Sequence, residues 1–132
     1  MTYIRQDHKQ PEAIEKWGWK YHHLGIPTDE IMPGETYIPQ FRLFVSGFSE
    51  SPFGIEWMRY EKDSPVNELI KSRPHIAFEV EDVYRELASH NFNVITPPNS
   101  PTDKIIVAMI EHNGAIIELI EFTKNRFQPA PV

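Results

Sequence analysis

Residues 74–83 read Pro74-His75-Ile76-Ala77-Phe78-Glu79-Val80-Glu81-Asp82-Val83, which is typical of a strand that runs directly into a helix. Successive side chains of a strand point to opposite faces. One face of this strand is therefore apolar and suits a core, whereas the other begins with His75. A single histidine at the head of a strand is more often a hydrogen-bonded structural residue than a functional one. Its meaning depends on the rest of the chain.

The same pattern occurs earlier in the sequence, where residues 23–26 read His-Leu-Gly-Ile. A glutamate in an Ile-Glu-apolar context follows each histidine, since Glu56 lies 33 residues after His23 and Glu118 lies 43 residues after His75. The second interval is longer by about the length of a helix, which we expect over residues 81–90. The chain is therefore predicted to contain two βαβββ units, of which the first has its helix replaced by a proline-rich loop.

The two glutamates need a physical reason, because both lie in predicted strands among apolar residues. Isolating a carboxylate in such surroundings is costly unless another group neutralises it. Two histidines and two glutamates, with no sulfur, suit a divalent metal ion. The repeat would bring His23, Glu56, His75 and Glu118 around one centre. The alternative is that the glutamates face outward and the histidines cap the ends of strands.

His22 is the nearest competitor of His23 as a ligand. Strict alternation places its side chain on the face of Leu24 and Ile26, which suits a histidine that faces the core better than a metal ligand.

One domain is expected over residues 1–132, because a chain of 132 residues can build one core but not two. We divide it into an N-terminal arm with a short helix (1–18), a first module (19–60), a linker (61–72), a second module (73–122) and a tail (123–132). A loop is expected over residues 27–39. Strands are expected over residues 19–26, 41–48, 53–60, 73–80, 94–96, 104–111 and 115–122.

Composition excludes several classes of function. The net charge of -6 argues against nucleic acid and against an anionic membrane surface as partners. The absence of cysteine excludes thiol catalysis and disulfides. We find no apolar signal segment and no run long enough to span a bilayer, so the expectation is a soluble cytoplasmic protein.

The pattern over residues 20–122 resembles the vicinal oxygen chelate superfamily, which includes glyoxalase I, methylmalonyl-CoA epimerase, extradiol dioxygenases and bleomycin resistance proteins. The resemblance rests on residues 23–26, on residues 75–83, and on the segment from Gly114 to Phe122. It implies an α+β fold in which paired βαβββ modules form a cupped mixed sheet. It also implies a divalent metal (Ni, Zn, Co, Mn or Fe) held by His23, Glu56, His75 and Glu118.

A complete set of four ligands resembles the isomerase and lyase branch of that superfamily. The resemblance therefore implies a glyoxalase-like lyase or epimerase that moves a proton next to a carbonyl of a small substrate, with Glu56 or Glu118 as the base. Arg42 and Tyr60 are the candidate contacts to that substrate.

Two other functions remain open at this point: a module that binds a small molecule without turnover, and an extradiol-type dioxygenase. The dioxygenase would need only two histidines and one carboxylate. The resemblance also implies a homodimer, and it leaves open whether the site lies within one chain or across two.

Overall fold

The computed structural model describes residues 6–123, and these residues form one mixed sheet in the strand order β2-β3-β4-β1-β5-β8-β7-β6. The strands of the first half are β1 (Lys20–Pro27), β2 (Thr36–Ile38), β3 (Leu43–Ser46) and β4 (Ile55–Tyr60). Those of the second half are β5 (His75–Glu79), β6 (Asn93–Asn99), β7 (Ile105–His112) and β8 (Ala115–Phe122). The helices are α1 (Glu12–Glu15), α2 (Glu68–Ser72) and α3 (Val83–Ser89), with a 3-10 turn at Phe48–Glu50.

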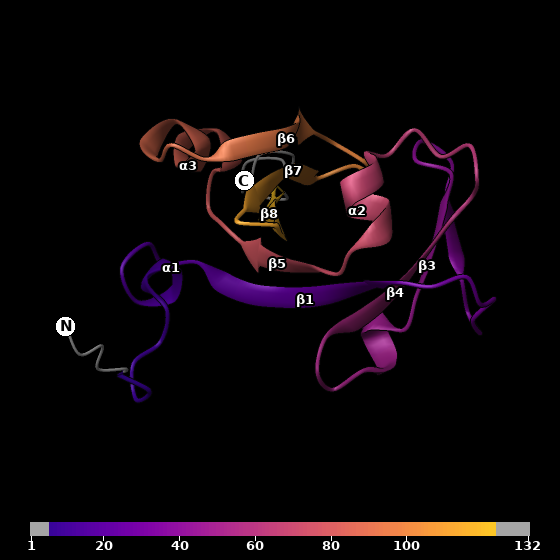
Figure 1. The fold of residues 1–132 in the computed structure, drawn as a ribbon, viewed down its shortest axis with the longest axis horizontal. Coiled ribbons are helices and arrows are strands. Elements are labelled where there is room, and N and C mark those ends of the chain that lie inside the picture. Colours follow the sequence, from indigo (N-terminus) through magenta and orange to yellow (C-terminus); the bar gives the residue numbers. More distant parts are fainter. Residues whose placement is uncertain (1–5, 124–132) are drawn as a thin grey trace, which may run out of the picture.

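The two halves of the sheet have the same internal order. In each half the last strand pairs in parallel with the first, β4 with β1 and β8 with β5. The halves meet where β1 and β5 pair antiparallel. Figure 1 shows β1 and β5 side by side, with the remaining strands of each half curling away from them and α2 between the two wings. The predicted α+β fold with paired modules and a cupped mixed sheet is confirmed.

The outer face of the second module carries the larger core cluster. Helix α3 starts at the N-cap Asp82, whose side chain accepts a hydrogen bond from the Arg85 amide, and it buries Val83 completely. Val83 packs with Val80 and Leu119, which point away from the concave face. The expected division of the strand over residues 74–80 into an apolar and a polar face is therefore correct.

The first module has no helix at the equivalent place, as predicted. The segment between β1 and β2 instead covers the outer face through Glu35, which accepts two hydrogen bonds from the Arg59 guanidinium at 2.8 and 2.7 Å. Arg59 also lies 4.1 Å above the ring of Phe44. The expectation that residues 27–39 are loop throughout is wrong at the end of that range, because Thr36–Ile38 pairs with β3 as an edge strand.

Other element boundaries differ from expectation for local reasons. Strand β6 continues through Pro97 and Pro98, which a central strand would not tolerate but an edge strand does. The Asn113-Gly114 turn joins β7 and β8 with positive φ at both residues, as an Asn-Gly hairpin requires.

Helix α2 lies in the expected linker and starts one residue after Asn67, which caps it. Within residues 6–123 no helix has the length and apolar character needed to cross a membrane. The first five residues of the predicted arm and the predicted tail beyond Thr123 lie outside the described residues.

Candidate metal centre

Strand register brings the candidate ligands to the centre of the concave face. Gly25 pairs with Glu56 across β1 and β4, and Ala77 pairs with Glu118 across β5 and β8. Each histidine precedes its paired small residue by two positions, so it lies on the same face as the corresponding glutamate. His23 and His75 then meet because β1 and β5 run side by side in opposite directions.

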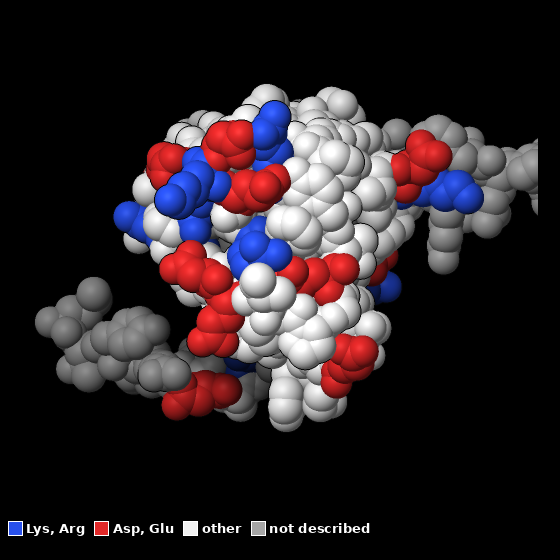
Figure 2. All heavy atoms as spheres, turned by 90° about the vertical axis from the view of Figure 1, so that its right-hand side faces the viewer, with Lys and Arg blue, Asp and Glu red and all other residues white. Residues whose placement is uncertain are grey.

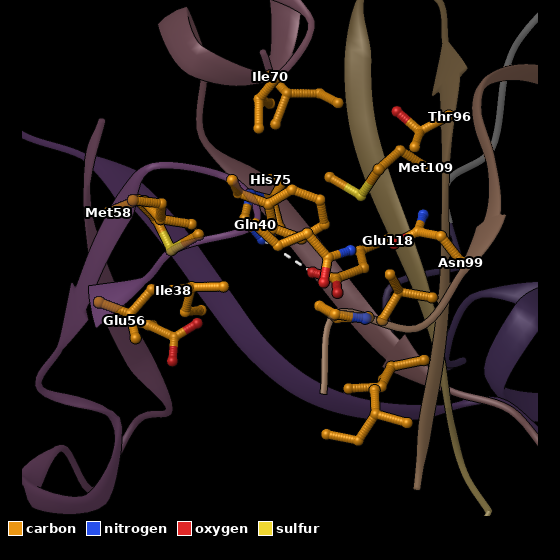
Figure 3. Close-up of a pocket in the computed structure, with 18 of the residues that line it drawn as sticks. Ile38, Gln40, Glu56, Met58, Ile70, His75, Thr96, Asn99, Met109 and Glu118 are labelled. Carbon is orange, nitrogen blue, oxygen red and sulfur yellow. Dashed lines mark ion pairs between the residues drawn. The ribbon is translucent and has the colours of Figure 1, made fainter. Parts of the chain in front are cut away.

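Three side chains converge on one point at this junction. Nε2 of His23 lies 3.3 Å from Nε2 of His75. Oε1 of Glu118 lies 3.4 Å from the first of these nitrogens and 3.1 Å from the second. Both histidines are buried, and all three residues come from one chain. Figure 3 shows the His75–Glu118 pair on the floor of the pocket.

The geometry of these atoms fits a metal ion. Three ligands at about 2.1 Å from a tetrahedral cation lie about 3.4 Å from one another, which is close to the observed triangle. An unprotonated ring nitrogen and an ionised carboxylate oxygen both offer lone pairs and no proton. Three such atoms that face one point therefore need a proton or a cation between them. His23, His75 and Glu118 therefore form a group that could hold a divalent metal.

Electrostatics inside this group favour an ionised Glu118. Burial alone would raise the pKa of its carboxyl, but hydrogen bonds from His23 and His75 lower that pKa to about 2. Burial would lower the pKa of His23, but the hydrogen bond and charge of Glu118 outweigh it and raise the pKa. The negative charge that a metal ion needs is therefore already present at Glu118.

Glu56, the fourth predicted ligand, lies beside the group rather than within it. Its Oε1 is 3.7 Å from Nε2 of His23, and it enters the pocket from β4 while Glu118 enters from β8 (Figure 3). Burial raises the pKa of its carboxyl, opposed by the charge of His23 and reinforced by that of Glu118. Glu56 is thus the carboxylate in this pocket with the greater tendency to carry a proton.

The prediction that His22 faces the core is wrong. The register of β1 against β5 shifts between Tyr21 and His23, so His22 occupies a β-bulge and alternation fails there. Its ring lines the same pocket, stacked on Phe48 at 4.9 Å between centroids, and its Nδ1 lies 2.7 Å from Nδ1 of His23. When Nε2 of His23 faces a cation, its Nδ1 carries the proton and donates to His22. No signal in the sequence marks this bulge.

The pocket above these residues has a volume of about 650 Å³, within the usual range of small-molecule sites. Tyr60, a predicted substrate contact, lines it beyond Glu56 and Met58 on β4, and burial raises the pKa of its phenol. Arg42, the other predicted contact, is not among the lining residues. Its half-exposed guanidinium forms an ion pair with Asp63 outside the pocket.

Sequence comparison finds no relative, since no model of a known protein family and no curated protein matches the chain. Comparison with solved structures finds chains with a similar fold. A hypothetical protein from Bacillus halodurans aligns with a TM-score of 0.62 at 18% identity, over 86% of this chain and 99% of that one. Methylmalonyl-CoA epimerase from Mycobacterium tuberculosis aligns with a TM-score of 0.56 at 19% identity, over 85% and 89% of the two chains.

These two similar structures show which fold the chain has. It has the vicinal oxygen chelate fold, and the resemblance in its sequence is confirmed at the level of the fold. Identities below one fifth carry no information about substrate, so function has to be argued from the site itself.

Proposed function

We propose that this chain is a divalent-metal-dependent, glyoxalase-like lyase or isomerase that moves a proton next to a carbonyl of a small substrate with two neighbouring oxygens. The observation that carries the proposal is the pairing of a compact His23–His75–Glu118 group with a second, less tightly held carboxylate, Glu56, in one pocket. A metal ion in the group, when bound, would polarise the two substrate oxygens.

Glu56 is the residue best suited to move the proton. Its raised pKa brings it closer to neutral pH, where a general base and acid works most effectively. Glu118 is less suited, because two histidines hold it and its pKa is about 2. The sequence left this choice open between the two glutamates, and the difference in their surroundings supports Glu56.

Tyr60 is proposed to orient the substrate. Its phenol stays protonated over the working pH range because burial raises its pKa. It can therefore donate a hydrogen bond to an oxygen of a ligand above Glu56. Arg42 is not included in this role, since its guanidinium pairs with Asp63 away from the pocket.

Proton exchange with solvent tests the proposal. The metal-loaded protein is incubated in D₂O with a panel of α-hydroxyketones, hemithioacetals and acyl thioesters, and deuterium at the α-carbon is followed by NMR. We expect exchange with at least one class of compound and its loss in Glu56→Gln. Absence of exchange throughout, together with tight ligand binding, would favour the non-catalytic binding module.

A second candidate is an extradiol-type dioxygenase, because the close group consists of two histidines and one carboxylate. That set is typical of non-haem Fe(II) oxygenases. Oxygen consumption by the Fe²⁺-loaded protein with a catechol, undiminished in Glu56→Ala, would support this candidate over proton transfer.

A further inference from the structure

The walls of the pocket contain no lysine or arginine among residues 6–123. Above the ligand group the lining is predominantly apolar and comes from both modules, including Met58 on β4, Met109 on β7 and Ile70 on α2 (Figure 3). The ionisable side chains in or beside the metal group are two carboxylates and three imidazoles: Glu56, Glu118, His22, His23 and His75. Elsewhere in the lining, the described part of the chain places no cationic side chain that would neutralise an anion.

Three cations that lie next to lining residues in the sequence are engaged elsewhere. Arg59 points to the opposite side of β4 from Met58 and Tyr60 and forms an ion pair with Glu35. Arg42 pairs with Asp63, and Lys71 pairs with Glu68. Figure 2, which looks onto the end of the molecule formed by β2 and β3, shows Lys and Arg lying among Asp and Glu. No cluster made up of Lys and Arg alone faces the viewer there.

The other polar groups in the lining are of a different kind. Gln40, Asn67, Thr96 and Asn99 line the pocket and carry amides or hydroxyls, which exchange hydrogen bonds with neutral oxygens and nitrogens. A carboxylate or phosphate buried against such a wall loses its hydration without gaining an opposite charge. The net charge of -6 on the whole chain adds a further repulsion.

We infer that the substrate is a small molecule whose body is apolar and uncharged beyond the two oxygens that reach the His23–His75–Glu118 group. This inference rests on the proposed metal site and narrows its substrate class: ligands carrying a carboxylate or phosphate on the part that fills the cavity are disfavoured. A ligand of this kind fills a cavity of about 650 Å³ through contact with side chains such as Met58, Ile70 and Met109.

A matched pair of ligands tests the inference. The probes are 2-hydroxyacetophenone and its 4-carboxylate, which share an α-hydroxyketone and differ by one anion at the far end of the ring. Calorimetric titration of the Zn²⁺-loaded protein is expected to give a Kd for the carboxylate at least about tenfold weaker. Equal or tighter binding of the carboxylate would overturn the inference, as would failure of both probes to bind.

A cation added to the wall gives an independent check. Thr96→Lys adds an ammonium to the pocket wall from β6. The ratio of the Kd for the carboxylated probe to the Kd for the neutral probe should therefore fall by about tenfold or more. The matched control is Thr36→Lys, which adds the same charge to an exposed position of β2 outside the pocket and should leave the preference unchanged. An equal effect of the two variants would contradict the role of the wall.

With these experiments, the inference about the substrate and the proposed function can each be refuted without the other. A preserved preference for the neutral probe without proton exchange would refute the proposed function and leave the inference standing. Exchange seen only with the carboxylated compound would support the proposed function and overturn the inference.

Discussion

The imidazole of His75 lies over the α-carbon of Gly25 on the neighbouring strand. A Cβ built at Gly25 would come within 2.2 Å of Cε1 and 2.6 Å of Nε2 of that ring, far inside van der Waals contact. The two residues are register partners in the β1–β5 pair. Gly25 therefore provides the space in which His75 reaches His23 and Glu118.

Gly25→Ala should displace the His75 ring and weaken metal binding by tenfold or more, as about 1–3 kcal/mol of crowding is relieved by moving the ring. Metal affinity is measured by competition with a chromogenic chelator. The matched control is Ala77→Gly, at the equivalent position opposite His23. It should cost about 0.5–1 kcal/mol of stability for backbone reasons but crowd no ligand. Equal losses of affinity in the two variants would show that Gly25 has no special relation to the site.

Glu56 and Glu118 should respond differently to the same isosteric change. Glu118→Gln removes a charged member of the close group and should lower metal affinity by about a hundredfold or more, as expected for a direct ligand. Glu56→Gln should change metal affinity by only a few-fold but slow proton exchange by about 10²–10⁴. Metal titration and exchange rate are measured on both proteins. A complete loss of metal from Glu56→Gln would return that residue to the ligand set.

His22 should act on the metal site through His23. Removing its ring nitrogen in His22→Leu leaves Nδ1 of His23 without its partner at 2.7 Å and should reduce metal affinity by about 10–100-fold. His22→Asn is the matched variant, because its side-chain oxygen can accept the same hydrogen bond and should restore most of the affinity. Equal affinities in both variants would indicate that the contact serves packing alone.

The pH dependence of the metal-free protein follows from His23. Its pKa is raised in the folded state above the ordinary 6.5, so its contribution to stability is present below 6.5 and is lost as the pH rises through the raised value. Glu118 acts in the other direction, since stability from its carboxylate is present above 4.5 and is lost as the pH falls toward about 2.

We therefore expect the melting temperature in EDTA to fall as the pH rises above 6.5, and to fall less when a divalent metal replaces the proton. Thermal unfolding between pH 5 and 9 measures both effects. His23→Gln should flatten the EDTA profile. A metal-free profile that rises with pH over this range would contradict the raised pKa of His23.

The paired modules were predictable from sequence, because the contexts around His23 and Glu56 recur in the same order around His75 and Glu118, with a longer interval that accounts for the helix. The helix of the second module was predictable from Asp82 and the apolar residues that follow it. The repeat predicted that the two modules share one centre. The antiparallel pairing of β1 and β5 that brings them together was not predicted, because no local signal specifies it.

The remaining differences have physical causes that a linear pattern does not contain. The bulge at His22 interrupts alternation within an ordinary-looking strand. Tyr60 lines the pocket as alternation from Glu56 predicts. Arg42, by contrast, has a positive φ of 50° directly before β3 and pairs with Asp63. The departures at His22 and at Arg42 both coincide with irregular backbone geometry. The homodimer and the cytoplasmic location stay predictions.

The central claim is that His23, His75 and Glu118 of one chain hold a divalent cation. The most direct measurement is an anomalous difference map from crystals of the Co²⁺- or Zn²⁺-loaded protein, collected at the absorption edge of the metal. We predict one strong peak per chain at about 2.0–2.2 Å from Nε2 of both histidines and from a carboxylate oxygen of Glu118. A fully loaded crystal with its peak elsewhere, or with no peak between these three side chains, would contradict the account.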